Sequence, residues 1–275
     1  MKHALTIAGS DCSGGAGLQA DLKTFAAHGV YGMSAVVSVV AENTCKVLDI
    51  QDISPKMIEQ QIEAVFSDIE VHAVKVGMLS SSESMLSVSK MLKHYQPQFT
   101  VIDPVMIAKG GCALMQPQAL QTLITEIIPL AYVLTPNIPE AQIITGLQLL
   151  TEQDRKQAAV KIHRMGAKHV LIKGGHLNNQ EAADDLLYDG KSFMVFTAKR
   201  IDSKNTHGTG CTFSSAIAAN LALGYALPDA VKLAKAYITA AIAHSLEIGK
   251  GHGPTHHFYD LYQNGLTIKE NEHAI

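Results

Sequence analysis

Short apolar runs alternate with amphipathic stretches along almost the whole of this 275-residue chain, and this alternation limits its possible folds most. Residues 4–9 (ALTIAG) are apolar without alternation, as in a strand that is buried on both faces. Residues 16–27 place Leu18, Leu22 and Phe25 on one helical face. Repeated pairs of this kind predict βαβ units: an α/β fold with a mostly parallel central sheet and helices on both faces.

The remaining predicted elements follow the same order. Further strands are predicted in SAVVSVVA, AVKVGML, FTVIDPV, AYVLTPN and HVLIKGG. Helices are predicted over residues 55–68, 82–95, 117–128, 152–165, 210–223 and 228–248. Asp189-Gly190 joins two extended runs, which predicts a hairpin at the sheet edge near residues 186–197. We expect a single domain over residues 1–265 and a loose polar tail over 266–275.

Charge and cysteine spacing argue against several classes of protein. The net charge of −3 does not favour binding to nucleic acid or to a membrane surface. No apolar run reaches the roughly 20 residues that a membrane span needs. The four cysteines, at positions 12, 45, 112 and 211, show no CxxC spacing, so neither a zinc site nor a redox pair is indicated. Their scatter suits a reducing cytosol, and we expect a cytoplasmic protein.

Polar motifs gather where the predicted parallel strands end. They are GSD, AENT, GML, DPVM, TPN and KGG, one after each of six strands. Ligands of such sheets bind beyond the carboxyl ends of the strands. This clustering predicts a site there more strongly than any single motif does, since loops are polar in general.

The turn HGTGC, residues 207–211, comes just before a predicted helix. The first N–H groups of a helix lack internal partners, and glycine lets a ligand approach the backbone, so the turn suits an anion. It matches neither the GxxxxGK[ST] nor the GxGxxG pattern. The alternative interpretation is an ordinary tight turn that is capped by Thr209. A second cluster, residues 9–17, is either another phosphate cradle or a close-approach loop that admits a flat ligand. Gly110-Gly111 after Lys109 indicates a mobile flap.

Six stretches in a fixed order carry a family resemblance. They are AGSDCSGGAGLQADLKTFAAHGVYGMSAV, AENT, DPVMIAKGG, TPNIPEA, IKGGH and HGTGCTFSSAIAA. Together they resemble the hydroxymethylpyrimidine and phosphomethylpyrimidine kinases of thiamine biosynthesis, within the ribokinase-like fold. The resemblance spans roughly residues 4–260. It implies phosphorylation of 4-amino-5-hydroxymethyl-2-methylpyrimidine and of its monophosphate, with ATP and Mg²⁺, in a homodimer. It leaves open whether K⁺ assists.

The resemblance also assigns the groups that handle phosphate. The backbone N–H groups of Gly208, Thr209, Gly210 and Cys211 would hold the phosphoryl group as charge accumulates on it. Lys173, at the end of a predicted strand, would neutralise nucleotide phosphate; a solvated strand-end lysine is the alternative.

Asp103, Asn137 and Glu140 bring oxygen atoms to neighbouring strand ends, and Mg²⁺ prefers oxygen ligands. In the families that this chain resembles, these positions organise the magnesium shell. Local alternatives are open for all three. Asp103 and Asn137 could make turn or capping bonds, and Glu140 could be a first-turn acid of its helix.

Cys211 stands where ribokinase-like sugar kinases usually have an aspartate base. A helix N-terminus lowers a thiol pKa from about 8.5, although bound polyphosphate opposes this. We hypothesise that Cys211 is the base for the alcohol step only. A phosphate monoester has a second pKa near ~6 and is already an anion at pH 7. A small buried cysteine without chemistry is the alternative.

Glu42 ends the second predicted strand and is the candidate residue for hydrogen bonding to the pyrimidine. An aminopyrimidine edge offers an NH₂ donor beside a ring nitrogen, and a carboxyl group meets both if one proton is shared. An exposed strand-end acid is the alternative. The resemblance places Lys235 near the adenine. We expect the same pocket to be lined by Asp11, Gly17, Gln19, Asp21, Met78 and Val105. The alternative is helix surface for Asp21 and the apolar core for Met78.

Three other functions remain in competition. A pyridoxal kinase of the same group would often carry a second cysteine in the flap, where this chain has Ala108, and Cys112 is no obvious substitute. A non-catalytic sensor could lose the magnesium shell or the glycine turn, yet both sets of residues are present. A dehydrogenase would need the dinucleotide fingerprint, which is missing.

Overall fold

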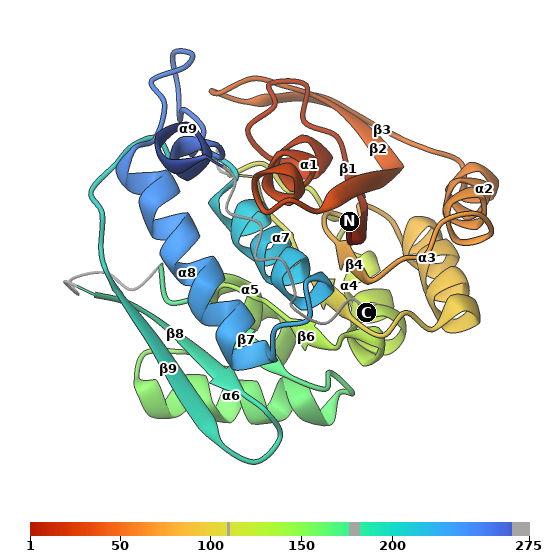
Figure 1. Ribbon diagram of the computed structural model, residues 1–275. Helices are drawn as coiled ribbons and strands as arrows, with labels where there is room; N and C mark the ends of the chain where they lie inside the picture. The colour runs from red at the N-terminus through yellow and green to blue at the C-terminus, as the bar shows by residue number, and fades with distance from the viewer. Residues whose placement is uncertain (109–110, 176–181, 266–275) are drawn as a thin grey trace, which may run out of the picture.

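The computed structural model describes residues 1–108, 111–175 and 182–265, and these contain a nine-stranded sheet of order β3-β2-β1-β4-β5-β6-β7-β8-β9 (Figure 1). The strands are β1 (His3–Gly9), β2 (Tyr31–Glu42), β3 (Val47–Asp52), β4 (Ala73–Val76), β5 (Thr100–Ile102), β6 (Val133–Leu134), β7 (Val170–Ile172), β8 (Ala182–Tyr188) and β9 (Phe193–Lys199). The six strands from β2 to β7 along this order pair in parallel. β3 at one edge and β8–β9 at the other are antiparallel. The predicted parallel sheet and edge hairpin are thus confirmed.

Helices cover both faces of the sheet. They are α1 (Gly17–Ala27), α2 (Pro55–Phe66), α3 (Ser82–Tyr95), α4 (Ala119–Thr122), α5 (Ile138–Thr145), α6 (Glu152–Arg164), α7 (Thr209–Ala222), α8 (Leu227–Ala243) and α9 (Tyr259–Asn264). Buried residues of α2 to α6 share one apolar core with Leu5 and Ile7 of β1. Those of α1, α7 and α8 share another with Ala4, because successive strand residues point to opposite faces.

The structure differs from the sequence prediction at several elements. The short helices α5 and α9 lie outside the predicted helix ranges. The predicted helix over 117–128 is α4 followed by a π turn (Leu123–Ile127) and a 3₁₀ turn (Ile128–Leu130), and Pro129 lies in the latter. The predicted helix over 228–248 ends at Ala243. Strand β3 was not predicted, because it is short and mostly exposed and its pairing with β2 is its main support.

Two predictions concern residues outside those described: the flap glycine Gly110 with Lys109, and the tail over 266–275. A single domain over residues 1–265 stays a prediction. Across the described part of the chain, none of the helices combines the length and the apolar character needed to span a membrane.

The parallel strands deliver six loops to one edge of the sheet, where α7 also begins. β1, β2, β4, β5, β6 and β7 all end there, because parallel neighbours share their direction. Figure 1 shows α7 lying beside α1 against the middle of the sheet. The start of α7 is therefore placed among the strand-end loops that the sequence marked as a site.

Candidate active site

Helix α7 begins at the predicted glycine turn without a side-chain cap. Gly208 is the N-cap residue, with a φ of 77°. Thr209 does not cap the helix, and its N–H and hydroxyl both donate to the carbonyl oxygen of Thr206, at 3.3 and 2.8 Å. Within the described chain the N–H groups of Gly208, Gly210 and Cys211 have no hydrogen-bond partner. Of the four N–H groups predicted to hold the phosphoryl group, that of Thr209 is therefore already engaged and the other three are free, and the phosphoryl-binding role stays a prediction.

The second glycine cluster, residues 9–17, packs directly against this turn. A Cβ atom on Gly208 would overlap the carbonyl oxygen of Gly15. Gly17 has a φ of 54°, and a Cβ atom there would lie 2.6 Å from the carbonyl oxygen of Gly9. Close approach of backbone to backbone therefore explains these two glycines. The sequence suggests a phosphate cradle or an opening for a flat ligand here, and both of these stay predictions.

Asp11 shapes this loop. It accepts hydrogen bonds from three N–H groups of residues 13–16, at 2.7 to 3.0 Å, and from His207 Nε2 at 2.8 Å. Its own N–H donates to Gln19 Oε1 at 2.7 Å. Burial alone would raise the pKa of Asp11, but the hydrogen bonds, His207 first, hold it well below its usual range. Asp11 and Gln19 thus hold the loop in place.

Glu42 lies beside Asp11 and His207. One ligand-type atom from each of Asp11, Glu42 and His207 falls within 4.8 Å of the others. Burial, and then the charge of Asp11, raise the pKa of Glu42 to about 7, with His207 opposing. Near neutral pH this carboxyl is therefore present both with and without its proton. Sequence reasoning missed His207; its place directly before the first glycine of the turn was the available signal.

Asp103 and Lys173 flank the other end of the turn. Lys173 Nζ lies 2.5 Å from Asp103 Oδ1. A Cβ atom on Gly210 would lie 3.3 Å from Lys173 Nζ and 3.4 Å from Asp103 Oδ2, so both side chains reach the helix start. Burial opposes the charge of Lys173, yet Asp103 and Glu140 raise its pKa overall. Lys173 is thus a paired, largely buried cation, and the solvated strand-end alternative is wrong.

Asn137 and Glu140 form a capping box at the start of α5. Asn137 Oδ1 accepts from the Glu140 N–H, and Glu140 Oε2 accepts from the Asn137 N–H, each at 2.8 Å. Burial first, and then Asp103, raise the pKa of Glu140 to about 7 against the charge of Lys173. The local bonding that the sequence offered as an alternative is therefore present, and it points Glu140 toward Asp103 and Lys173.

Cys211 and Asp21 differ from expectation. Burial raises the pKa of the Cys211 thiol to about 11, although Lys75 and the Gly17 N–H act in the opposite direction. The expected lowering by the helix N-terminus is thus outweighed. Asp21 is neither pocket wall nor helix surface: its carboxylate is fully buried and lies 2.9 Å from Lys75 Nζ.

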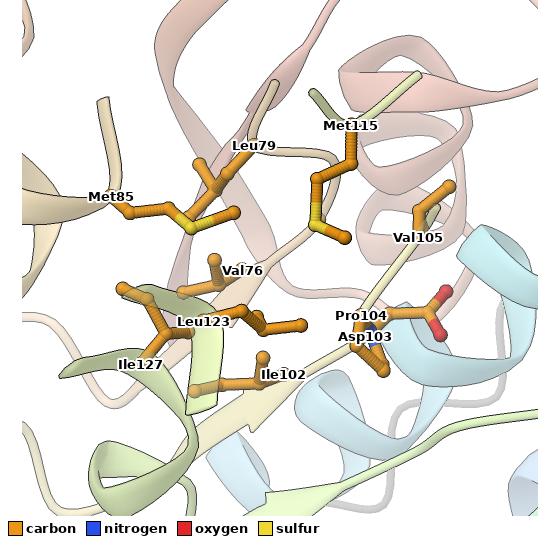
Figure 2. A pocket seen from close by; sticks show the side chains of 11 residues that line it. Val76, Leu79, Met85, Ile102, Asp103, Pro104, Val105, Met115, Leu123 and Ile127 are labelled. Carbon is orange, nitrogen blue, oxygen red and sulfur yellow. The ribbon is translucent and has the colours of Figure 1, made fainter. Parts of the chain in front are cut away.

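The last predicted residues lie around this centre. Met78 is buried, and its sulfur would lie 3.2 Å from a Cβ atom on Gly9. Val105 lines a cavity of about 10 Å³ with apolar side chains such as Met85 and Met115, and Figure 2 shows the Asp103 carboxylate turned away from them. Asp103 is the only charged residue among the described residues that line this cavity.

Lys235 takes part in a network of hydrogen bonds. Its Nζ lies 2.6 Å from Asp185 Oδ2 and donates to the Ala183 carbonyl oxygen at 2.7 Å. Asp185 Oδ1 in turn accepts from the Gly174 N–H at 2.8 Å. This network supports the backbone directly after Lys173, and the placement of Lys235 near adenine stays a prediction.

A parallel sheet whose strand-end loops surround an uncapped glycine turn, with a lysine–carboxylate pair at one end, is an arrangement that suits phosphoryl transfer. Comparison with known proteins identifies the class as a kinase of the ribokinase-like fold. The similarity of this chain to known proteins supports this assignment. The sequence profile of the family described as phosphomethylpyrimidine kinase matches residues 11–256. The chain belongs to this phosphomethylpyrimidine kinase family.

Individual relatives resemble the chain over most of its length. A hydroxymethylpyrimidine/phosphomethylpyrimidine kinase from Rhizobium meliloti is 50% identical over 95% of this chain and 98% of its own. The thiamine biosynthesis bifunctional protein ThiED from Geobacter sulfurreducens is 49% identical, and the chain, matched over 92% of its length, spans about half of that longer relative (51%).

Solved structures show the same similarity. The ADP complex of Bacillus subtilis pyridoxal kinase superimposes with a TM-score of 0.88 at 43% identity, covering 94% of this chain and 98% of that one. Phosphomethylpyrimidine kinase from Clostridium difficile gives 0.79 at 49% identity, covering 88% and 100%.

The contact between the two glycine loops can be tested by adding one methyl group. In Gly208→Ala the new Cβ atom meets the Gly15 carbonyl, in addition to the strain of a positive φ. Gly224→Ala is the matched control, since Gly224 has a φ of 92° with open space around it. We expect about 1 kcal/mol of destabilisation in the control and at least ~2 kcal/mol more in Gly208→Ala. Urea unfolding measures both; equal losses would contradict the close contact.

Proposed function

We propose that this chain uses ATP to phosphorylate 4-amino-5-hydroxymethyl-2-methylpyrimidine and then its monophosphate, in thiamine biosynthesis. Family membership and relatives at about 50% identity support this reaction. The observation that carries it is the position of the glycine turn. His207 at its start lies beside Glu42, and Gly210 lies against Asp103 and Lys173. One short turn therefore joins groups that suit a pyrimidine to groups that suit phosphate.

Phosphoryl transfer needs positioning and charge neutralisation more than covalent chemistry. The free N–H groups of Gly208, Gly210 and Cys211 would bind the oxygen atoms of the group in transfer, at the positive end of the α7 dipole. Lys173 adds a full positive charge beside them. Lys235 holds the backbone after Lys173 through Asp185, and a contact with adenine remains our prediction.

Oxygen donors at the end of the turn fit Mg²⁺. The carboxylates of Asp103 and Glu140 would hold the ion, directly or through water, while Asn137 keeps Glu140 oriented through the capping box. Bound there, Mg²⁺ would neutralise charge on the nucleotide phosphates. Lys173, now paired with Asp103, would be free to turn toward phosphate.

The alcohol step needs a proton acceptor. The Cys211 thiolate would take the proton of the substrate hydroxyl, and the hydroxyl oxygen would form a bond to the γ-phosphorus. The bond from that phosphorus to the bridging oxygen would break, and ADP would leave with the electron pair. Because the thiol pKa is about 11, the thiolate fraction rises about tenfold per pH unit across the neutral range.

The other predicted site residues would bind or enclose the pyrimidine. Glu42, in its protonated form, would donate to the ring nitrogen and accept from the amino group of the pyrimidine. Gly17, Met78 and Val105 would form the walls, with Asp11 and Gln19 holding the loop. A homodimer, a cytoplasmic location and any help from K⁺ stay predictions.

A coupled assay of ADP release tests the function directly. With Mg²⁺ and ATP, we expect turnover of hydroxymethylpyrimidine and of its monophosphate, each at a higher kcat/KM than pyridoxal. Pyridoxal is included because structural neighbours at 37–43% identity are pyridoxal kinases. Binding of the pyrimidine without ADP release would instead favour a sensor, and faster turnover of pyridoxal would reverse the order of substrates.

The role of Cys211 predicts different losses for the two substrates. Cys211→Ala should lower kcat for the alcohol by about 10²-fold or more, the usual size of a general-base contribution. It should lower kcat for the monophosphate severalfold at most, because that nucleophile is already ionised. The wild-type kcat for the alcohol should also rise above pH 7. Equal losses in kcat for the two substrates would refute this division of labour.

The role of Glu42 predicts a pH dependence of binding. The wild-type KM for hydroxymethylpyrimidine should rise as the pH passes 7, because the ionised carboxyl cannot donate to the ring nitrogen. Glu42→Gln keeps one donor and one acceptor at every pH, so its KM should stay flat. Glu42→Ala should lose about 1–3 kcal/mol of binding. A Gln variant as weak as the Ala variant would show that the pairing is wrong.

A further inference from the structure

A buried ion pair lies outside every step described so far. Lys75 of β4 and Asp21 of α1 are both fully buried, with Nζ 2.9 Å from Oδ2. The Asp21 carboxylate also accepts hydrogen bonds from the hydroxyls of Thr6 and Ser215, each at 2.6 Å. Lysine in a buried strand is costly to desolvate, and such a pair adds little net stability over apolar residues. Its location points to another role.

The ion pair lies one helical turn further along α7 than Cys211, beside Ser215. Helices α1 and α7 pack side by side (Figure 1). The Gly17 N–H faces the Cys211 sulfur, and four residues further along each helix the Ser215 hydroxyl donates to Asp21. Residues four apart occupy successive turns of one helical face, about 5.4 Å apart along the axis.

Four charged groups act on the Cys211 sulfur, one from each neighbouring segment. They are Asp21 from α1, Lys75 from β4, Asp103 after β5 and Lys173 after β7. Asp21 and Asp103 disfavour the thiolate, as burial does, and Lys75 is the charge that favours the thiolate most. Burial would also favour neutral Lys75, but Asp21 first, then Cys211 and Asp103, raise its pKa above the ordinary value.

We propose that Lys75 is a positioning residue for phosphorylation of the alcohol: its buried ammonium stabilises the Cys211 thiolate from below, and Asp21 keeps that ammonium charged. The inference rests on the proposed function, in which the thiolate accepts the hydroxyl proton. Because Lys75 is fully buried, we expect it to contact neither substrate. The pair would thus support the thiolate in a site where the bound nucleotide supplies only negative charge.

The test is the pH profile of Cys211 alkylation by iodoacetamide, without nucleotide or Mg²⁺. Mass spectrometry of the Cys211 peptide separates it from the three exposed cysteines. Two variants are compared with wild type. Asp21→Asn leaves the ammonium unpaired, so Lys75 should release its proton. Asp21→Asn with Lys75→Met replaces the pair by neutral side chains of similar size.

We expect both variants to alkylate about tenfold more slowly than wild type at pH 8, with the rising limb of the profile shifted to higher pH. Ser215→Ala is the matched control, because it removes a hydrogen bond to Asp21 and leaves both charges. It should keep the wild-type profile. Melting curves check that each variant is folded, and Asp21→Asn alone suffices if the double variant does not fold.

Steady-state turnover completes the test. Both charge variants should lower kcat for the alcohol about as much as they slow alkylation, with less than a twofold change for the monophosphate. Unchanged alkylation in both variants, or faster alkylation in Asp21→Asn, would overturn the proposal. Slow alkylation with unchanged kcat for the alcohol would also overturn the role of Lys75 in the reaction. It would leave the kinase activity itself intact.

Discussion

The direct contact between two glycine-rich turns is the constraint on which the rest of the site depends. Gly208 and Gly15 meet backbone to backbone, where no side chain would fit. This contact brings the loop after β1 against the start of α7. Asp11 and His207 then join the two turns by a second, polar link. The free N–H groups of α7 consequently face the strand-end loops instead of open solvent, which is what an anion site in a folded kinase requires.

Charges around this turn are arranged in pairs, and the pairing has a physical reason. Lys173 with Asp103 and Lys75 with Asp21 are largely or wholly buried, so neither partner could stay ionised alone. A site that must receive a polyphosphate needs stored positive charge, and buried lysines supply it only if carboxylates hold them charged beforehand. In the proposed reaction Lys173 would turn from Asp103 to the ligand, whereas Lys75, which is enclosed in the core, would act on Cys211 without contacting the ligand.

Much of this architecture could be predicted from local pattern. Unbroken apolar runs such as residues 4–9 and the helical spacing in 16–27 report burial directly, so the parallel sheet and its helices followed. Strand β3 was missed because its support comes from its partner β2. The region 117–130 was predicted as one helix, yet the backbone there changes from α to π to 3₁₀ geometry around Pro129.

The sequence by itself determined most of the order of strands and helices, the edge hairpin, the glycine turn at a helix start and the family. These depend on short-range periodicity and on motifs that keep their spacing. Tertiary structure alone decided which groups are charged and what they touch. It joined His207 to Asp11 across 196 positions, buried Asp21 against Lys75, and raised the Cys211 pKa where a helix start alone would lower it. A pKa depends on burial and on charges from distant segments, and only the folded chain specifies both.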